Sequence, residues 1–103
     1  MIQAQTRSRT SSRARWQKAA QRAIDEAIQV RQLQGTGQWI ATSGTQSGVA
    51  YELSVTGNIA YGCDCLAGLN DDPVCKHRAA WYLAIGALTF IPDPAPAAPA
   101  LAA

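Results

Sequence analysis

Apolar residues recur at three- and four-residue steps through the first third of the chain. This spacing is typical of the buried stripe of an amphipathic helix. Ser11 or Ser12 supplies an N-cap, and Gly35 supplies a C-cap after about Gln34. The pattern therefore predicts a helical segment over residues 11–36. Its stripe comprises Trp16, Ala20, Ala23, Ile24, Ala27, Ile28, Val30 and Leu33.

Beyond this segment the pattern changes to the two-residue alternation of strands. Residues 38–43 form a short strand candidate, and residues 49–55 alternate between an apolar and a mixed face. Thr56-Gly57-Asn58 predicts a tight turn, so that residues 59–65 return as a paired strand. If the alternation persists, one face of this return strand carries Ile59, Tyr61, Cys63 and Cys65.

A second helix is predicted after the strands. Asp72 before Pro73 is a helix-start signal, and the apolar run that follows favours a helix from about Val74 to Leu88. The order helix, hairpin or three-stranded meander, helix (αβββα) predicts a small α+β fold. Residues 38–91 would form its core. A mobile basic arm over residues 1–10 and a disordered Pro/Ala tail over residues 92–103 would flank the fold.

Composition fits one small globular domain, because 48% of the 103 residues are hydrophobic and 16% are charged. The start of the chain has no apolar secretory core. The longest apolar run, over residues 83–91, is too short to span a bilayer. We therefore expect a soluble intracellular (cytoplasmic) protein without a membrane partner. A domain of this size gains from an additional staple such as a metal.

Basic residues concentrate near the N-terminus. The net charge is only +2, yet six of the nine basic residues and no acidic residue fall within the first 24 positions. Such a segment can bind nucleic acid or another acidic surface, and it can also be an ordinary solvated helix. An organelle transit peptide is a third reading. It is disfavoured because the segment continues into a predicted helix of the fold.

All three cysteines and the only histidine lie within fifteen residues, in the pattern C-x-C-x9-C-x-H. Two cysteines separated by one residue point the same way on a strand, and the second pair stands at a helix entrance. Three thiolates and an imidazole match the closed tetrahedral set of a structural zinc site. A disulfide would leave one cysteine over, and a Cys–His nucleophile would not explain three clustered cysteines. Buried structural cysteines beside a hydrogen-bonded histidine are the remaining alternative. The expected zinc ligands are Cys63, Cys65, Cys75 and His77.

The segment CDCLAGLNDDPVCKHRAAWYLA resembles a SWIM-type zinc finger, whose pattern is C-x-C-x(n)-C-x-H. The likeness covers about residues 48–88. It differs from many members at Leu66 and Val74, where they carry proline. The resemblance implies a hairpin followed by a helix, and a role in binding DNA or proteins. It also implies a partner such as a helicase- or transposase-type enzyme.

Two functions remain open. The first is nucleic-acid binding, with DNA favoured. The second is a protein-interaction module that uses the apolar helix from Trp81 to Phe90. We do not expect an enzyme, because the zinc site uses the only histidine and every thiol. The expected phosphate contacts are Arg13, Arg15, Lys18, Arg22, Lys76 and Arg78.

Overall fold

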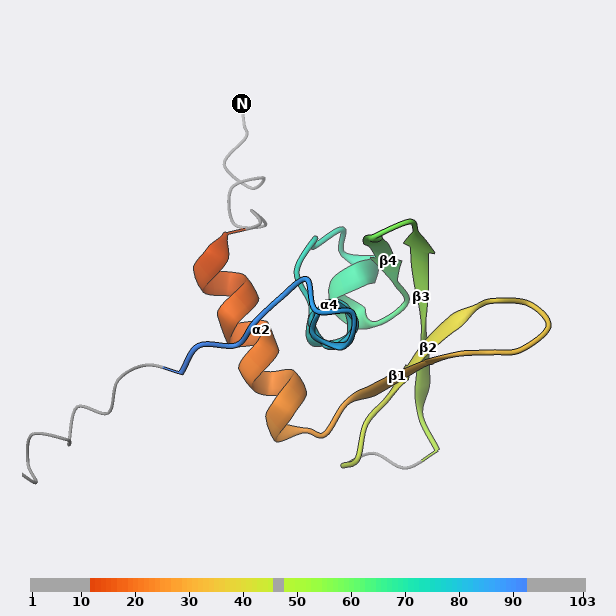
Figure 1. Cartoon of the computed structure of the whole chain (residues 1–103), viewed down its shortest axis with the longest axis horizontal. Coiled ribbons are helices and arrows are strands. Elements are labelled where there is room, and N and C mark those ends of the chain that lie inside the picture. Colours follow the sequence, from red (N-terminus) through yellow and green to blue (C-terminus); the bar gives the residue numbers. More distant parts are fainter. Residues whose placement is uncertain (1–11, 46–47, 93–103) are drawn as a thin grey trace, which may run out of the picture.

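The computed structural model describes residues 12–45 and 48–92, so residues 1–10 and 93–103 of the predicted arm and tail lie outside the described residues. The described chain forms three layers, with one helix between a second helix and a four-stranded antiparallel sheet (Figure 1). This arrangement confirms the predicted small α+β fold. The elements are α2 (Arg13–Asp25), β1 (Gln29–Gln32), β2 (Trp39–Thr42), β3 (Ala50–Thr56), β4 (Ile59–Cys63), α3 (Leu66–Leu69) and α4 (Lys76–Ala84).

Helix α4 is the central layer, and Trp81 is its main core residue. Trp81 is buried, and its ring meets Trp39 of β2 edge-to-face at 6.0 Å. On the other side of α4, Tyr82 meets Trp16 of α2 at 5.3 Å. Among the described elements, α2 packs on α4 and on no strand. Helix α4 is thus covered by the sheet on one side and by α2 on the other.

The N-terminal helix is shorter than predicted. It ends at Asp25, and residues predicted to continue it form β1. Ala27 adopts a left-handed conformation (φ 51°), and the Ile28 amide donates to the Ala23 carbonyl at 2.9 Å. This is a Schellman closure with alanine in the place usually taken by glycine. The Gly44 amide donates to the carbonyls of both Glu26 and Ala27, so the segment after β2 helps to fix the helix end.

The buried stripe of α2 also differs from the prediction. Ala20 and Ala23 are buried as expected, together with Ala19. Ile24 is 51% exposed and Ala27 is exposed, so neither docks the helix onto the core. Small alanine side chains allow α2 to approach α4 closely, and Trp16 supplies the aromatic contact.

A β-bulge in β4 changes which side chains face the core. Leu53 pairs with Cys63 and Val55 with Ala60, so β4 holds one more residue than β3 between these pairs, and Tyr61 is left over. Ala60 and Cys63 therefore both face inward although they are three residues apart. The prediction that Ile59 and Tyr61 share the face of Cys63 was wrong.

Helix α4 is also shorter than the predicted span from Val74 to Leu88. Its N-cap is Cys75 and not Asp72. It ends before Gly86 (φ 81°), where the Ala87 amide donates to the Tyr82 carbonyl at 2.9 Å. The glycine permits this left-handed exit, which an L side chain would disfavour.

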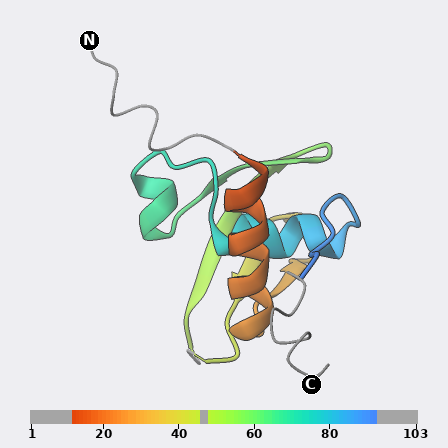
Figure 2. The same cartoon turned by 90° about the vertical axis from the view of Figure 1, so that its left-hand side faces the viewer.

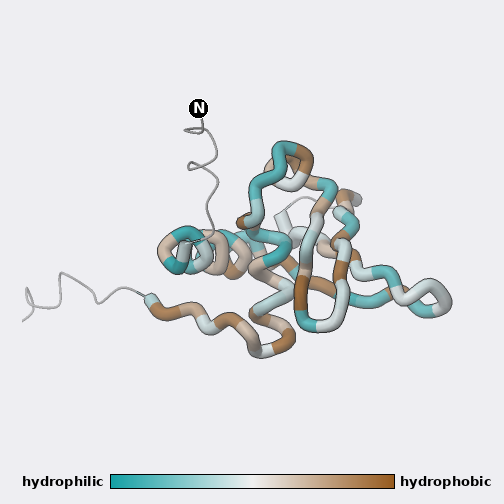
Figure 3. The backbone as a smooth tube through the Cα atoms, turned by 90° about the horizontal axis from the view of Figure 1, so that it is seen from above, coloured by the Kyte–Doolittle hydropathy of each residue, from teal (hydrophilic) through white to brown (hydrophobic). Residues whose placement is uncertain are grey.

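The segment after α4 runs back beside α2 (Figures 2 and 3). The amide of the Gln17 side chain donates to the Thr89 carbonyl, and its carbonyl accepts from the Ile91 amide, both at 2.8 Å. Figure 3 shows this segment as largely hydrophobic up to the grey trace. No helix within residues 12–45 and 48–92 is both long and apolar enough to cross a membrane.

Candidate metal centre

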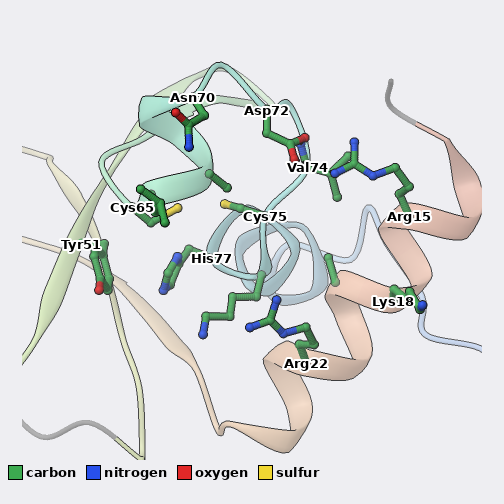
Figure 4. A pocket seen from close by; sticks show the side chains of 14 residues that line it. Arg15, Lys18, Arg22, Tyr51, Cys65, Asn70, Asp72, Val74, Cys75 and His77 are labelled. Carbon is green, nitrogen blue, oxygen red and sulfur yellow. Dashed lines mark hydrogen bonds and ion pairs between the residues drawn. The ribbon is translucent and has the colours of Figure 1, made fainter. Parts of the chain in front are cut away.

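The four predicted ligands come from the junctions of three elements. Cys63 is the last residue of β4, and Cys65 is the N-cap of the short helix α3. Cys75 is the N-cap of α4, and His77 lies in its first turn. All four are buried. Figure 4 shows the sulfur atoms of Cys65 and Cys75 directed toward one another, with the His77 ring beside them.

The donor atoms of these residues form one compact cluster. The three sulfur atoms and the imidazole nitrogen all lie within 4.8 Å of one another. Cys63 Sγ lies 3.6 Å from His77 Nδ1. Tetrahedral coordination at ordinary Zn–S and Zn–N lengths separates such a pair by about 3.6 Å. The residues present therefore fit a metal ion, and three sulfur donors with one nitrogen are typical of a zinc site.

Charge explains why the cluster favours a cation. Hydrogen bonds donated by Cys63 and then Cys75 lower the pKa of the Cys65 thiol. Hydrogen bonding to Cys65 in turn raises the pKa of Cys63, and burial adds to that effect. A thiolate at Cys65 therefore opposes ionisation of its neighbour. A bound divalent cation would remove this conflict, because it would stabilise all three thiolates together.

Neighbouring groups contact both members of the second predicted ligand pair, Cys75 and His77. The Arg78 amide donates to Cys75 Sγ at 3.3 Å, which closes the first turn of α4 around the ligand. The ring of Tyr51, on β3, lies 4.4 Å from the ring of His77. Asp72 does not cap α4 but accepts a hydrogen bond from the Val74 amide at 3.0 Å. This hydrogen bond fixes the turn from Asp72 to Val74, which leads directly into Cys75.

Two ion pairs connect Asp72 and Lys76, which flank Cys75, to α2 and its C-cap residue Glu26. Arg15 Nη2 lies 2.6 Å from Asp72 Oδ2, and Lys76 Nζ lies 2.5 Å from Glu26 Oε1. The hydrogen bond from Lys76 lowers the pKa of Glu26, so this carboxylate stays charged at neutral pH. The pair's stabilisation is present above the ordinary pKa of a glutamate and is lost as the pH falls through the lowered value.

We expect Glu26→Gln to lower the free energy of unfolding at neutral pH by up to about 1 kcal/mol, the range of a partly exposed ion pair. About 1 M salt should remove most of the difference, because the Debye length is then about 3 Å. Urea titrations of preparations with equal metal content measure this effect. Asp25→Asn, on the neighbouring exposed residue, is the matched control, and an equal loss there would contradict the role given to Glu26.

The basic residues predicted to contact phosphate fall into three environments. Four of them line one cleft of about 570 Å³ between α2 and the ligand cluster, which Figure 4 shows from close by. These four are Arg15, Lys18, Arg22 and Lys76.

The remaining two predicted contacts lie outside this cleft. Arg13 is exposed beside the C-terminal segment. Arg78 is buried, and its guanidinium donates to the carbonyls of Pro73 at 2.7 Å and Tyr61 at 3.1 Å. Arg78 therefore supports the fold around Cys75 and is not available as a surface cation.

Sequence reasoning missed three residues that position the site. The sequence predicted Asp72 only as a helix start, and it gave no role at the site to Glu26 or Tyr51. Each acts on a partner 26 or more positions away along the chain. No local spacing signals such a contact, so none could have been found from the pattern of one sequence.

No protein-family model, curated protein or solved structure matches the chain. The likeness to SWIM-type zinc fingers therefore depends on the four ligands and the hairpin–helix order around them. The structure supports the coarser statement: three buried cysteines and a histidine form a cluster that could hold a metal ion, consistent with a zinc finger.

Proposed function

We propose that this chain is a SWIM-type zinc-binding accessory protein that binds nucleic acid and catalyses no reaction. The observation that supports zinc is the convergence of Cys63, Cys65, Cys75 and His77 on one buried point. These four residues would hold the ion and fill a tetrahedral set, which leaves no coordination position for a substrate. The ion would supply folding free energy and charge neutralisation.

The positions of the three cysteines explain why a metal here would be structural. Cys65 and Cys75 each begin a helix, so fixing their sulfur atoms also fixes the starts of α3 and α4. Cys63 fixes the end of β4. A shared ion would connect all three elements, and Tyr51 and the Arg78 amide would hold two of the ligands in orientation. We infer no enzyme, because the histidine and thiols that could act as base or nucleophile are the ligands.

The cleft beside the centre supports the proposal of nucleic-acid binding. Its four cations face two acidic partners, Glu26 and Asp72, which gives a local sum of +2. Lys18 and Arg22 on α2 are exposed, and Lys18 makes no ion pair within the described residues. Phosphate oxygens could replace water around these two side chains without loss of a buried bond. DNA is favoured only through the SWIM resemblance.

Neutralising the two exposed cleft cations tests this proposal. Lys18→Gln with Arg22→Gln should weaken binding to duplex DNA for all sequences alike. It should reduce the slope of log K against log salt by about 1.8, since each phosphate contact contributes about 0.9. The slope is measured by fluorescence anisotropy over a salt series with random duplex and single-stranded oligonucleotides.

The matched control carries two neutralised cations outside the cleft, Arg13→Gln with Arg31→Gln, both exposed. An equal reduction in slope for both double variants would show that only total charge matters. Absence of any salt-sensitive binding by the native protein would refute the nucleic-acid function and leave the zinc centre untouched. Arg15 is kept unchanged in both, because its loss would also break the ion pair with Asp72.

A further inference from the structure

A second surface lies on the face formed by β3, β4 and α3, which we call the β4–α3 surface. Five exposed side chains define it: Glu52, Tyr61, Asp64, Leu69 and Asp71. They line a hollow of about 470 Å³, and none of its lining residues also lines the basic cleft. The proposed functions of the centre and the cleft use none of these five side chains.

The apolar part of this surface is costly to leave in water. Leu69 is 70% exposed, and Tyr61 is 62% exposed. Tyr61 is directed outward because the bulge in β4 removes it from the alternation. No residue of α3 is buried, so this short helix presents its leucines to solvent. Neighbouring exposed apolar groups with a polar rim are typical of a surface that docks another molecule.

The polar rim has a definite sign. Glu52, Asp64 and Asp71 are exposed carboxylates, and the only cation that lines the hollow is Arg78. The guanidinium of Arg78 already donates to two main-chain carbonyls. The hollow therefore has a formal charge sum of −2, opposite to that of the basic cleft. It would repel a phosphate backbone and attract lysine or arginine side chains.

The main chain of β4 does not offer an open edge at this place. The Ala60 amide donates to the Tyr82 hydroxyl at 2.9 Å, and the Tyr61 carbonyl accepts from Arg78. Addition of a partner strand would have to displace these bonds to α4. Recognition at this surface therefore depends on side chains: an apolar contact at Tyr61 and Leu69, with carboxylates around it.

We propose that the β4–α3 surface docks a basic segment of a partner protein. An apolar side chain of that segment packs between Tyr61 and Leu69, and its lysines or arginines pair with Glu52, Asp64 and Asp71. Charge complementarity favours a basic occupant, since a neutral or acidic segment would leave the three rim carboxylates without cationic partners. The protein then has two faces of opposite charge, one for phosphates and one for a basic protein.

A fluorescent lysine-rich peptide with two interspersed leucines is the probe, and the same peptide with glutamate for lysine is its counterpart. Both are titrated onto the full-length, metal-loaded protein at low salt. The lysine peptide should bind and the glutamate peptide should not. Leu69→Ser should weaken binding by about tenfold, as for loss of a central apolar anchor. Asp71→Asn should weaken it about threefold, and high salt should abolish that difference.

The variants are chosen so that the fold is retained. Asp71 has a left-handed backbone (φ 61°), which asparagine tolerates well. Ile24→Ser and Asp25→Asn on α2 are the matched controls, because both residues are exposed and line neither the hollow nor the cleft. These controls should bind the lysine peptide as the native protein does.

Three results would overturn the proposal: no binding of the lysine peptide, equal binding of the glutamate peptide, or equal affinity of the Leu69→Ser and native proteins. Sedimentation of the protein alone distinguishes another occupant. Self-association of the native protein that Leu69→Ser abolishes would assign this surface to a second copy of the chain, and would equally overturn a basic partner segment.

Discussion

Cys65→Ser is expected to eliminate the bound metal and to unfold the β3–β4 hairpin and α4 together. Metal binding at sites of this kind contributes on the order of 10 kcal/mol to folding. Most small domains have only about 5–15 kcal/mol of net stability. The loss therefore removes most or all of the stability of the chain. The core also depends directly on the site, since Cys63, Cys65 and Cys75 belong to the same buried cluster as Leu53 and Trp81.

Elemental analysis of the reduced protein gives the metal content, and circular dichroism over a temperature ramp gives the stability. Chelation of the native protein should reproduce the variant. Leu66→Ser is the matched control, because Leu66 adjoins Cys65 in sequence and is 76% exposed. It should retain one metal per chain. Native circular dichroism with an unchanged Tm in Cys65→Ser would refute a structural metal centre.

Gly68→Ala is expected to give the second-largest loss of stability, although Gly68 is not one of the four predicted ligands. Helix α3 approaches the end of β4 so closely that a Cβ atom at Gly68 would lie 1.8 Å from the Cys63 carbonyl oxygen and 2.7 Å from its carbon. The Cys63 main chain cannot move away easily, since it pairs with Leu53 and carries a ligand. Relief of the clash must shift Cys63 or Cys65. Either shift would increase the distances between the sulfur atoms and the His77 nitrogen.

The expected cost is about 3 kcal/mol or more, at the upper end of overpacking effects. Metal affinity should fall in parallel. A competition titration against a chromogenic chelator measures the affinity, and thermal melting measures the stability. Gly62→Ala is the matched control, because a Cβ there would meet only the Ser54 side chain, at 3.2 Å. Its cost should not exceed about 1 kcal/mol. Equal behaviour of the two variants would contradict the close approach at Gly68.

The fold variants and the surface variants together distinguish the proposals from one another. Loss of the metal centre should abolish binding at both the basic cleft and the β4–α3 surface, because Cys65, Cys75 and His77 line the first and Cys63 lines the second. Neutralising Lys18 and Arg22 should affect nucleic-acid binding alone. Leu69→Ser should affect the basic peptide alone. This pattern of selective losses distinguishes a defect in the fold from a defect in one surface.

The cluster of Cys63, Cys65, Cys75 and His77 could be predicted from the sequence because its spacing is local. Cys63 and Cys65 are two residues apart at a strand end, and Cys75 and His77 are two apart at a helix start. The turn at Gly57-Asn58 and the alternation from Tyr51 to Val55 were equally local, and all of them appear in the structure. Short-range sterics and two-residue periodicity suffice to predict features of this kind.

Tertiary contacts decided the helix ends, the outward position of Tyr61 and the long-range ion pairs. The helical spacing of apolar residues continues through Ile28 and Val30, yet both pack on the core from the sheet side, because Ala27 closes the helix and Gly44 binds its end. The bulge that turns Tyr61 outward also brings Ala60 and Cys63 onto the same buried face of β4, and no local pattern in the sequence signals it. The ion pairs of Glu26 and Asp72 join residues at least 50 positions apart. The sequence by itself thus determined the Cys/His cluster and the hairpin, whereas packing around Trp81 determined where helices end and which charges meet, since those depend on free energies summed over distant neighbours.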